Sequence, residues 1–131
     1  MKYKLFFSLL ASGFVMGCLL VSQTSTAVTC NAQVELYAKH PSFMVNVEGL
    51  PSAGYLWRVT NQPQWLHLEH TETIPSVLIG GPTQEAWTFH ASDEAFLSAQ
   101  TATLDLTFAR PWEKGEPAAK ICRIILVTHT E

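Results

Sequence analysis

The sequence predicts an all-β domain, a two-sheet sandwich of about seven short strands. Apolar and polar side chains alternate along most of the chain, which is the period of a strand with one buried face. Gly, Pro and Asn interrupt these runs at short intervals, as they do in turns. Seven such runs in about 100 residues favour an immunoglobulin-like sandwich, with a small closed barrel as the alternative.

The strand runs follow one another with clear breaks between them. A first strand is expected near Cys30 to Tyr37. Five further runs alternate between apolar and polar residues, so that one face of each can point inward: 43–48, 55–59, 66–69, 87–90 and 103–108. In the run 66–69, both leucines are expected to point inward. The last run, Ile121 to Val127, is apolar except for Arg123, which predicts a strand buried on both sides or central in its sheet. The segment 92–99 is expected to form at most one helical turn.

Three of the connections are rich in Gly and Pro. With the strands labelled A to G, these connections are the B–C, D–E and F–G loops, near 49–54, 80–82 and 111–117. In an immunoglobulin-like sandwich these three loops lie at the same end. The sequence therefore predicts that one end of the domain carries the most unusual turn residues.

The N-terminal part has the order of a secretory signal peptide. Two lysines precede an almost wholly apolar run, 5–21, and a small polar segment then ends in the cleavage pattern Ser25-Thr26-Ala27. We therefore expect residues 1–27 to be a signal peptide and residues 28–131 to form the mature domain. The same reading places the protein outside the cytoplasm, either secreted or periplasmic.

Two alternatives for this segment remain open. The apolar run is about as long as the roughly 20 residues of a membrane-spanning helix, so an uncleaved anchor is one of them. The other is lipid attachment at Cys18, within the sequence Val15-Met16-Gly17-Cys18. Met16 fits a lipoprotein processing pattern poorly, and the apolar run continues beyond the cysteine. A membrane would be a partner only if Cys18 is lipidated.

The charge of the mature chain argues against nucleic acid as a partner. Removing the leader with its two lysines leaves six basic and eleven acidic residues, a formal charge of −5. No run of Lys or Arg remains, whereas nucleic acids and anionic membranes bind basic surfaces. We expect a monomer that needs no cofactor.

Cys30 and Cys122 are the two cysteines of the mature chain, and they fall in the first and last predicted strands. An even pair in an exported protein indicates a disulfide. Two buried free thiols, which pack like small apolar residues, are the alternative. A C-x-x-C pair is missing from the sequence, so neither a redox motif nor a zinc knuckle is supported.

An enzyme is the first rival hypothesis, because His67, Glu69 and His70 could act as metal ligands or acid–base groups. Strand alternation places His67 and His70 on opposite faces, which is poor geometry for one metal ion. No nucleophile has a plausible base beside it. We therefore expect surface residues here, with no metal site and no catalytic residue.

The B–C loop resembles the N-P-T-T-G-Y/F loop of the chagasin family of cysteine protease inhibitors. The matching residues are Pro51, Gly54 and Tyr55, and Ser52 stands where the family has Thr. Two positions depart from the pattern, namely Leu50 and Ala53.

The other two loops extend the resemblance. In the D–E loop, Gly80 and Gly81 match the family pattern G-x-G-G, although Leu78 stands in place of its first glycine. The F–G loop contains the family's R-P-W whole, as Arg110-Pro111-Trp112, at the end of a predicted strand. The resemblance runs from about Val34 to Val127, and each motif falls on the loop where the family has it.

The resemblance implies a reversible, non-covalent inhibitor of papain-like cysteine proteases. Members of the family are immunoglobulin-like sandwiches that insert the three loops, uncleaved, into the active-site cleft. The implied protease-binding residues are Pro51, Ser52, Ala53, Gly54, Tyr55, Gly80, Gly81, Arg110, Pro111 and Trp112. Ser52 and Ala53 would lie near the catalytic cysteine, Gly80 and Gly81 would offer backbone to the cleft wall, and Trp112 would pack on an aromatic surface of the enzyme.

Some of these residues also have purely structural interpretations. Tyr55 and Trp57 point inward in the alternation, and Trp65 and Trp87 are expected in the core or at a sheet edge. Arg110 either bonds loop carbonyls or touches the enzyme. A second rival hypothesis is an exported binding or adhesion module without inhibitory activity, because a sandwich fold does not determine function.

Overall fold

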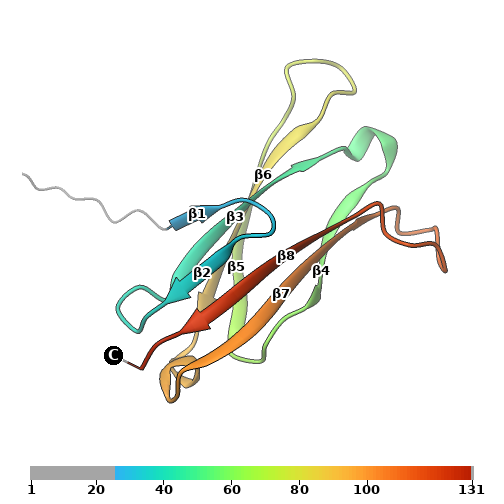
Figure 1. Cartoon of the computed structure of the whole chain (residues 1–131). Helices are drawn as coiled ribbons and strands as arrows, with labels where there is room; N and C mark the ends of the chain where they lie inside the picture. Colours follow the sequence, from blue (N-terminus) through green and yellow to red (C-terminus); the bar gives the residue numbers. More distant parts are fainter. Residues whose placement is uncertain (1–25, 131) are drawn as a thin grey trace, which may run out of the picture.

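The computed structural model describes residues 26–130, which form two four-stranded sheets packed face to face (Figure 1). The first sheet has the order β1-β3-β6-β5, with β1 at Thr26–Val28, β3 at Ser42–Gly49, β6 at Thr83–Ala91 and β5 at Leu66–Ile74. The second has the order β2-β8-β7-β4, with β2 at Gln33–Leu36, β8 at Lys120–Thr128, β7 at Gln100–Ala109 and β4 at Leu56–Asn61. The predicted all-β sandwich is confirmed.

The strands pair in a simple pattern. β1 lies parallel to β3 and β2 lies parallel to β8, while the other neighbours are antiparallel. Two short 3-10 turns complete the described chain, η1 at Pro51–Ala53 and η2 at Asp93–Phe96. The second falls inside the segment 92–99, where a single helical turn was the most that the sequence predicted.

The first two strands lie in different sheets. β1 belongs to one sheet and β2 to the other, and the chain crosses between them at Cys30 and Asn31, where Asn31 has a φ of 67°. The strand predicted near Cys30 to Tyr37 forms as β2. β1 lies in a segment that the sequence assigns mainly to the leader, so eight strands form within residues 26–130 instead of about seven. The predicted Cys30–Cys122 disulfide is present and ties this crossing segment to β8, with the Cα atoms 4.9 Å apart.

The leader lies mostly outside the described residues, and so does Cys18. Thr26 and Ala27, which the sequence assigns to the leader, pair with β3 as part of β1. Within residues 26–130, no helix is long and apolar enough to span a membrane.

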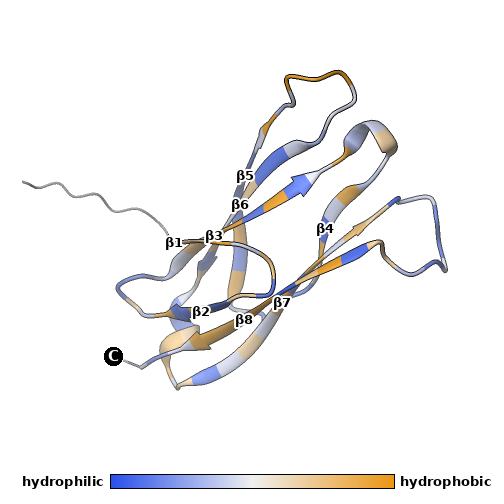
Figure 2. Cartoon of the chain, turned by 45° about the horizontal axis from the view of Figure 1, so that its top comes forward, coloured by the Kyte–Doolittle hydropathy of each residue, from blue (hydrophilic) through white to orange (hydrophobic). Residues whose placement is uncertain are grey.

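Alternation along the strands fills the core as predicted, and Figure 2 shows the alternating hydropathy. The inward residues of β3 and β7 are buried: Phe43, Val45, Val47, Leu104, Leu106 and Phe108. The Phe43 and Phe89 rings stack across the β3–β6 pair with centroids 5.5 Å apart. Trp57 and Trp65 are buried as expected, and the indole of Trp57 donates a hydrogen bond to the Glu48 carbonyl. This packing fixes the strand ends from which the loops project.

The expected orientation of the two histidines on β5 is wrong. A bulge between Leu68 and His70 shifts the register, so that His67 pairs with His90 and His70 pairs with Thr88. Since His90 and Thr88 share a face of β6, His67 and His70 also share a face, not opposite ones as alternation predicts. Even so, no group of three His, Cys, Asp or Glu residues within the described chain could hold a metal ion.

The exposure of Leu68 differs from the prediction, whereas β8 takes one of its two predicted placements. Leu68 is opposite the buried Phe89, yet it is 41% exposed because β5 is the edge strand of its sheet. β8 lies between β2 and β7, so the central placement that was one of its two predicted alternatives is confirmed, and its residues alternate between buried and exposed. Ile121 and Arg123 point to solvent, whereas Cys122 and Ile124 are buried.

Candidate functional site

The three loops of interest lie together at one end of the sandwich (Figure 1). They are the β3–β4 connection (the B–C loop, residues 50–55), the β5–β6 connection (the D–E loop, 75–82) and the β7–β8 connection (the F–G loop, 110–119). The turn η2 and the C-terminus lie at the opposite end. The prediction that the Gly- and Pro-rich connections lie at one end of the domain is therefore confirmed.

The B–C loop is a closed turn. The amides of Ala53 and Tyr55 both donate to the Leu50 carbonyl, at 3.1 and 3.3 Å, and the Gly54 amide donates to the Pro51 carbonyl at 2.9 Å. Pro51 fixes φ at the start of η1, and Gly54 ends it with a φ of 84°, a conformation that favours glycine. The loop is thus shaped by its own backbone before anything binds to it.

Arg110 holds the B–C loop from the side. Its Nε donates a 2.9 Å hydrogen bond to the Ala53 carbonyl, and its guanidinium lies 4.4 Å from the centre of the Tyr55 ring. Nη1 forms a 3.1 Å ion pair with Glu113. Of the two roles left open for Arg110, bonding a loop carbonyl is the one that the structure shows.

Trp112 lies against the apex of the same loop. Its indole is so close to Gly54 that a Cβ atom at that position would come within 2.2 Å of Cη2. The side chain is nevertheless 65% exposed. Trp112 therefore packs on the B–C loop with part of its surface and presents the rest to solvent, outside the core.

The D–E loop is held mainly by its own atoms. Ser76 Oγ accepts a hydrogen bond from the Leu78 amide, and the Leu78 carbonyl accepts one from the Gly81 amide, both at 3.0 Å. Gly81 passes so close to Ser76 that a Cβ atom there would lie 2.3 Å from Oγ. A single bond between loops links this turn to its neighbour, because Ser52 Oγ donates to the Gly80 carbonyl at 3.0 Å.

Some of the predicted site residues contact a neighbouring loop, and others do not. Contacts connect the B–C loop to Gly80, Arg110 and Trp112, so most of the set forms one surface. Gly81 is bonded within its own loop, and Pro111 is an exposed residue between two contacting neighbours. Tyr55 is half-buried and stacks on Phe108, as its inward alternation predicts.

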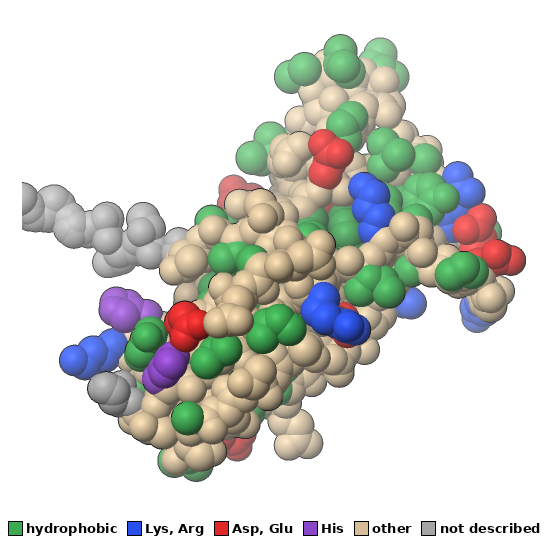
Figure 3. Space-filling view, in the orientation of Figure 1, with side chains coloured by type: hydrophobic (Ala, Val, Ile, Leu, Met, Phe, Trp, Pro, Cys, Tyr) green, Lys and Arg blue, Asp and Glu red, His purple; other side chains and the backbone are tan. Residues whose placement is uncertain are grey.

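Two features of this end escape the sequence argument. The first is Gly49, at the base of the B–C loop, which leaves room for the side chain of Glu85. A Cβ atom on Gly49 would lie 2.1 Å from the Glu85 carboxylate. The Glu85 carboxylate accepts a hydrogen bond from the Trp87 indole. The second feature is the apolar tip of the D–E loop, Val77-Leu78-Ile79, which projects at the top of Figure 3. Its signal in the sequence is three aliphatic residues between Ser76 and Gly80, outside any strand period.

The chain resembles known proteins in sequence and in fold. The profile of the chagasin family peptidase inhibitor I42 matches residues 38–126, more than half of the sequence. The chain is similar to the crystal structure of the cysteine protease inhibitor EhICP2 from Entamoeba histolytica, with a TM-score of 0.54 and 22% identity. The alignment covers 74% of this chain and 96% of that one, and at this identity it shows a shared fold alone. No curated protein matches the chain.

Proposed function

This chain belongs to the chagasin family of peptidase inhibitors, and we propose that it blocks papain-like cysteine proteases by inserting its B–C, D–E and F–G loops into the active-site cleft. The family is one of inhibitors, which agrees with the expectation that the chain is not an enzyme. The observation that carries the proposal is the bracing of the B–C loop by Arg110 and Trp112. It joins the B–C and F–G loops into one preformed surface, to which the Ser52–Gly80 hydrogen bond links the D–E loop.

Preformed loops favour tight binding for a physical reason. Ordering a flexible loop on binding consumes free energy that the contacts would otherwise supply. Here the Arg110 hydrogen bond and the Trp112 ring restrict the B–C loop in the free protein, and Pro51 restricts its backbone further. The contacts with a protease therefore need to offset little conformational entropy.

The conformation of the B–C loop also supports an inhibitor that is not cut. A protease cleaves a peptide that lies extended through its active site, whereas Pro51–Ala53 forms a 3-10 turn closed by hydrogen bonds to Leu50 and Pro51. Unwinding this turn would break those bonds and the Arg110 contact together. We propose that Ser52 and Ala53 lie near the catalytic cysteine in this closed form.

The inhibition we propose is reversible and non-covalent. The side chains of residues 50–55 contain no electrophile, and the backbone carbonyls that a thiolate would attack lie in a closed 3-10 turn. Trp112 would pack its exposed surface on an aromatic region of the enzyme, as aromatic residues do at many interface hot spots. Gly80 and Gly81 would bring backbone close to the cleft wall.

A titration against papain tests the function. We expect increasing amounts of the purified protein to abolish hydrolysis of a peptide substrate, and dilution to restore it. Mass spectrometry after incubation should find both proteins at their original masses. Full papain activity at a high molar excess of the protein would contradict the proposed function, and an adduct or a cut within 50–55 would contradict its mechanism.

We also propose that the protein is exported, secreted or periplasmic, and acts as a monomer. Cleavage after Ala27 would start the chain at Val28, which lies opposite Val45 in the β1–β3 pair. N-terminal sequencing of exported protein tests this, because lipidation would place a modified Cys18 at the start instead. Sedimentation of the purified protein tests the oligomeric state.

A further inference from the structure

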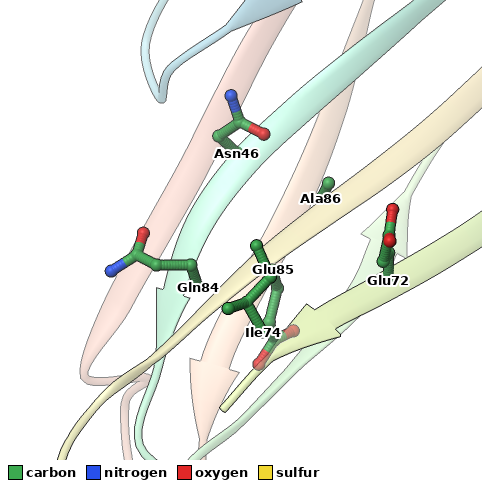
Figure 4. Close-up of a pocket in the computed structure, with 6 residues that line it drawn as sticks. All are labelled: Asn46, Glu72, Ile74, Gln84, Glu85 and Ala86. Atoms are coloured by element: carbon green, nitrogen blue, oxygen red, sulfur yellow. The ribbon is translucent and has the colours of Figure 1, made fainter. Parts of the chain in front are cut away.

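The outer face of the first sheet has a hollow over Ala86, in the middle of three paired strands. Val45 and Val47 point into the core, so Asn46 between them points to solvent. Ala86 on β6 is paired with Asn46 on one side and with Glu72 of β5 on the other, so the three side chains share this face. The short methyl group of Ala86 leaves a space of about 320 Å³, lined by Asn46, Glu72, Ile74, Gln84, Glu85 and Ala86 (Figure 4).

The lining of this hollow combines hydrogen-bond acceptors with aliphatic surface. The exposed carboxylate of Glu72 accepts hydrogen bonds when it is ionised, and the amide oxygens of Asn46 and Gln84 accept them as well. Ala86 provides an apolar floor, and Ile74, which is 62% exposed, provides an apolar wall. An ammonium group has three donors and no acceptor, and in lysine it is carried on an aliphatic stem that packs on apolar surface. The lining therefore matches an aliphatic amine.

The charges of the two sheets favour a cationic ligand on this face. The strands of the first sheet contain four glutamates and neither Lys nor Arg. The three basic residues that lie in strands all belong to the second sheet: Arg58, Lys120 and Arg123. Within residues 26–130, neither Glu48 nor Glu72 forms an ion pair. Glu48 instead accepts a 3.3 Å hydrogen bond from Gln84 Nε2, which leaves the amide oxygen of Gln84 as an acceptor.

We infer that the hollow binds the ammonium group of an aliphatic amine, supplied either by a lysine side chain of a polypeptide or by a free polyamine. The ammonium lies over Ala86 and donates hydrogen bonds to Glu72 and Asn46, while its methylene groups pack on Ile74. The hollow lies on the strands of the first sheet, whereas the loops proposed to bind a protease form one end of the sandwich. The inference is therefore independent of the proposed function.

Two other ligand classes fit the hollow less well. A bare cation such as Ca²⁺ takes a full shell of oxygen ligands, and no group of three acidic or histidine residues in the described chain could hold a metal ion. An anionic ligand would be repelled by Glu72, and the strands of this sheet offer it no Lys or Arg. An amine needs fewer acceptors than a metal ion and uses the aliphatic wall as well.

The test follows the NMR signals of Ala86 and Ile74 while the protein is titrated with the amide of Nα-acetyl-lysine. The amide of Nα-acetyl-norleucine is the matched ligand, because it keeps the aliphatic stem and lacks the ammonium group. We expect millimolar binding of the lysine compound and at least about 5-fold weaker binding of the norleucine compound, the effect of one exposed ion pair. Spermidine and a blocked Gly-Lys-Gly peptide identify the source, because the amine that the hollow is built for should bind more tightly than the other.

Three variants separate the hollow from the general charge of the face. Ala86→Leu fills the space and should abolish binding, and Glu72→Gln should weaken it about 5-fold. Glu69→Gln is the matched control, since it removes the same charge from the same strand outside the lining, and it should bind like the parent. Glu72→Gln alters an exposed side chain, so it should keep the parent's urea midpoint and decides the matter even if Ala86→Leu does not fold.

The inference is wrong if the norleucine compound binds as tightly as the lysine compound, or if the signals of Ala86 and Ile74 do not shift. It is also wrong if Glu69→Gln loses as much affinity as Glu72→Gln, because a diffuse negative field would then explain the binding. Papain inhibition by Glu72→Gln should match that of the parent, so this inference and the proposed function stand or fall separately.

Discussion

The B–C and D–E loops touch each other through one hydrogen bond, yet they keep their shapes by different means. The B–C loop depends on side chains that lie more than fifty positions further along the chain, because Arg110 bonds its carbonyl and Trp112 covers its glycine. The D–E loop depends on Ser76, Leu78 and Gly81, which are its own residues. The first loop is braced by the F–G loop, and the second is self-supporting.

This difference separates two ways of building an inhibitory surface. A braced loop has its weak points outside itself, so substitutions in the F–G loop should change the B–C loop. A self-supporting loop can change its exposed side chains without losing its shape. The D–E loop is accordingly the one whose tip departs furthest in character from a glycine-rich turn.

The largest expected effect comes from filling the space between Gly54 and Trp112. Gly54→Ala should weaken inhibition about 1,000-fold, because the new Cβ displaces the Trp112 ring and the loop apex together. Gly115→Ala is the matched control, since Gly115 has nearly the same positive φ, 83° against 84°, but nothing within 4 Å of its Cβ position.

Both alanines introduce backbone strain of about 1 kcal/mol, so the two variants should lose similar stability on that account. Inhibition constants and urea midpoints for both variants separate strain from displacement of the ring. Equal inhibition by the two variants would mean that the Gly54–Trp112 contact does not support the B–C loop.

The next effect comes from removing the brace at Trp112. Trp112→Ala should weaken inhibition about 30- to 1,000-fold, the range of a buried interface tryptophan, and cost under about 1 kcal/mol of stability. Leu104→Ala, in the core, should reverse this pattern by losing about 2 to 4 kcal/mol of stability while the folded fraction still inhibits.

The same two measurements, an inhibition constant and a denaturation midpoint, decide between these roles. A Trp112→Ala protein that inhibits as well as the parent, or unfolds as readily as Leu104→Ala, would make Trp112 a structural residue. Combined with Gly54→Ala, the change should be far from additive, because the displaced ring is then already missing.

A smaller effect is expected from Arg110→Lys, which keeps the charge but loses the planar group that bonds Ala53 and stacks on Tyr55. We expect about a 10-fold weaker inhibition, mostly as a slower association rate, because fewer free molecules hold the B–C loop in its binding form. Hydrogen exchange of the Ala53 and Gly54 amides should become faster in the free variant. Unchanged exchange with faster dissociation would instead show that Arg110 contacts the enzyme.

The architecture was predictable because it rests on local pattern. Alternation such as that of Phe43, Val45 and Val47 identifies a buried face without any knowledge of the partner strand. The loop motifs were recognisable for a related reason, since each lies within a few consecutive residues. The family match over residues 38–126 confirms the resemblance that these motifs indicate.

The remaining features depend on contacts across the chain, which no local pattern encodes. The bulge beside Glu69 reverses the alternation of β5 and puts His67 and His70 on one face. The crossing at Asn31 leaves an additional strand, β1, in the other sheet from β2. The Arg110 brace likewise joins Ala53 across 57 positions, so the sequence could name the residue but not choose between its two roles.

The smallest expected effect tests the independence of the two loops at their one shared bond. Ser52→Ala removes the hydrogen bond from Ser52 Oγ to the Gly80 carbonyl, at an exposed position where such a bond contributes about 1 kcal/mol or less. Inhibition should weaken about 3- to 5-fold. Ser52→Thr keeps the hydroxyl and should inhibit like the parent.

The decisive measurement for Ser52→Ala is hydrogen exchange of the Gly81 amide, which bonds the Leu78 carbonyl inside the D–E loop. A self-supporting loop keeps this bond when its link to the B–C loop is lost, so exchange at Gly81 should not change. Faster exchange there, with a loss of inhibition as large as that of Arg110→Lys, would show that the D–E loop is also braced from outside. The contrast between the two loops would then give way to a single coupled surface, in which the apolar tip depends on Ser52 for its position.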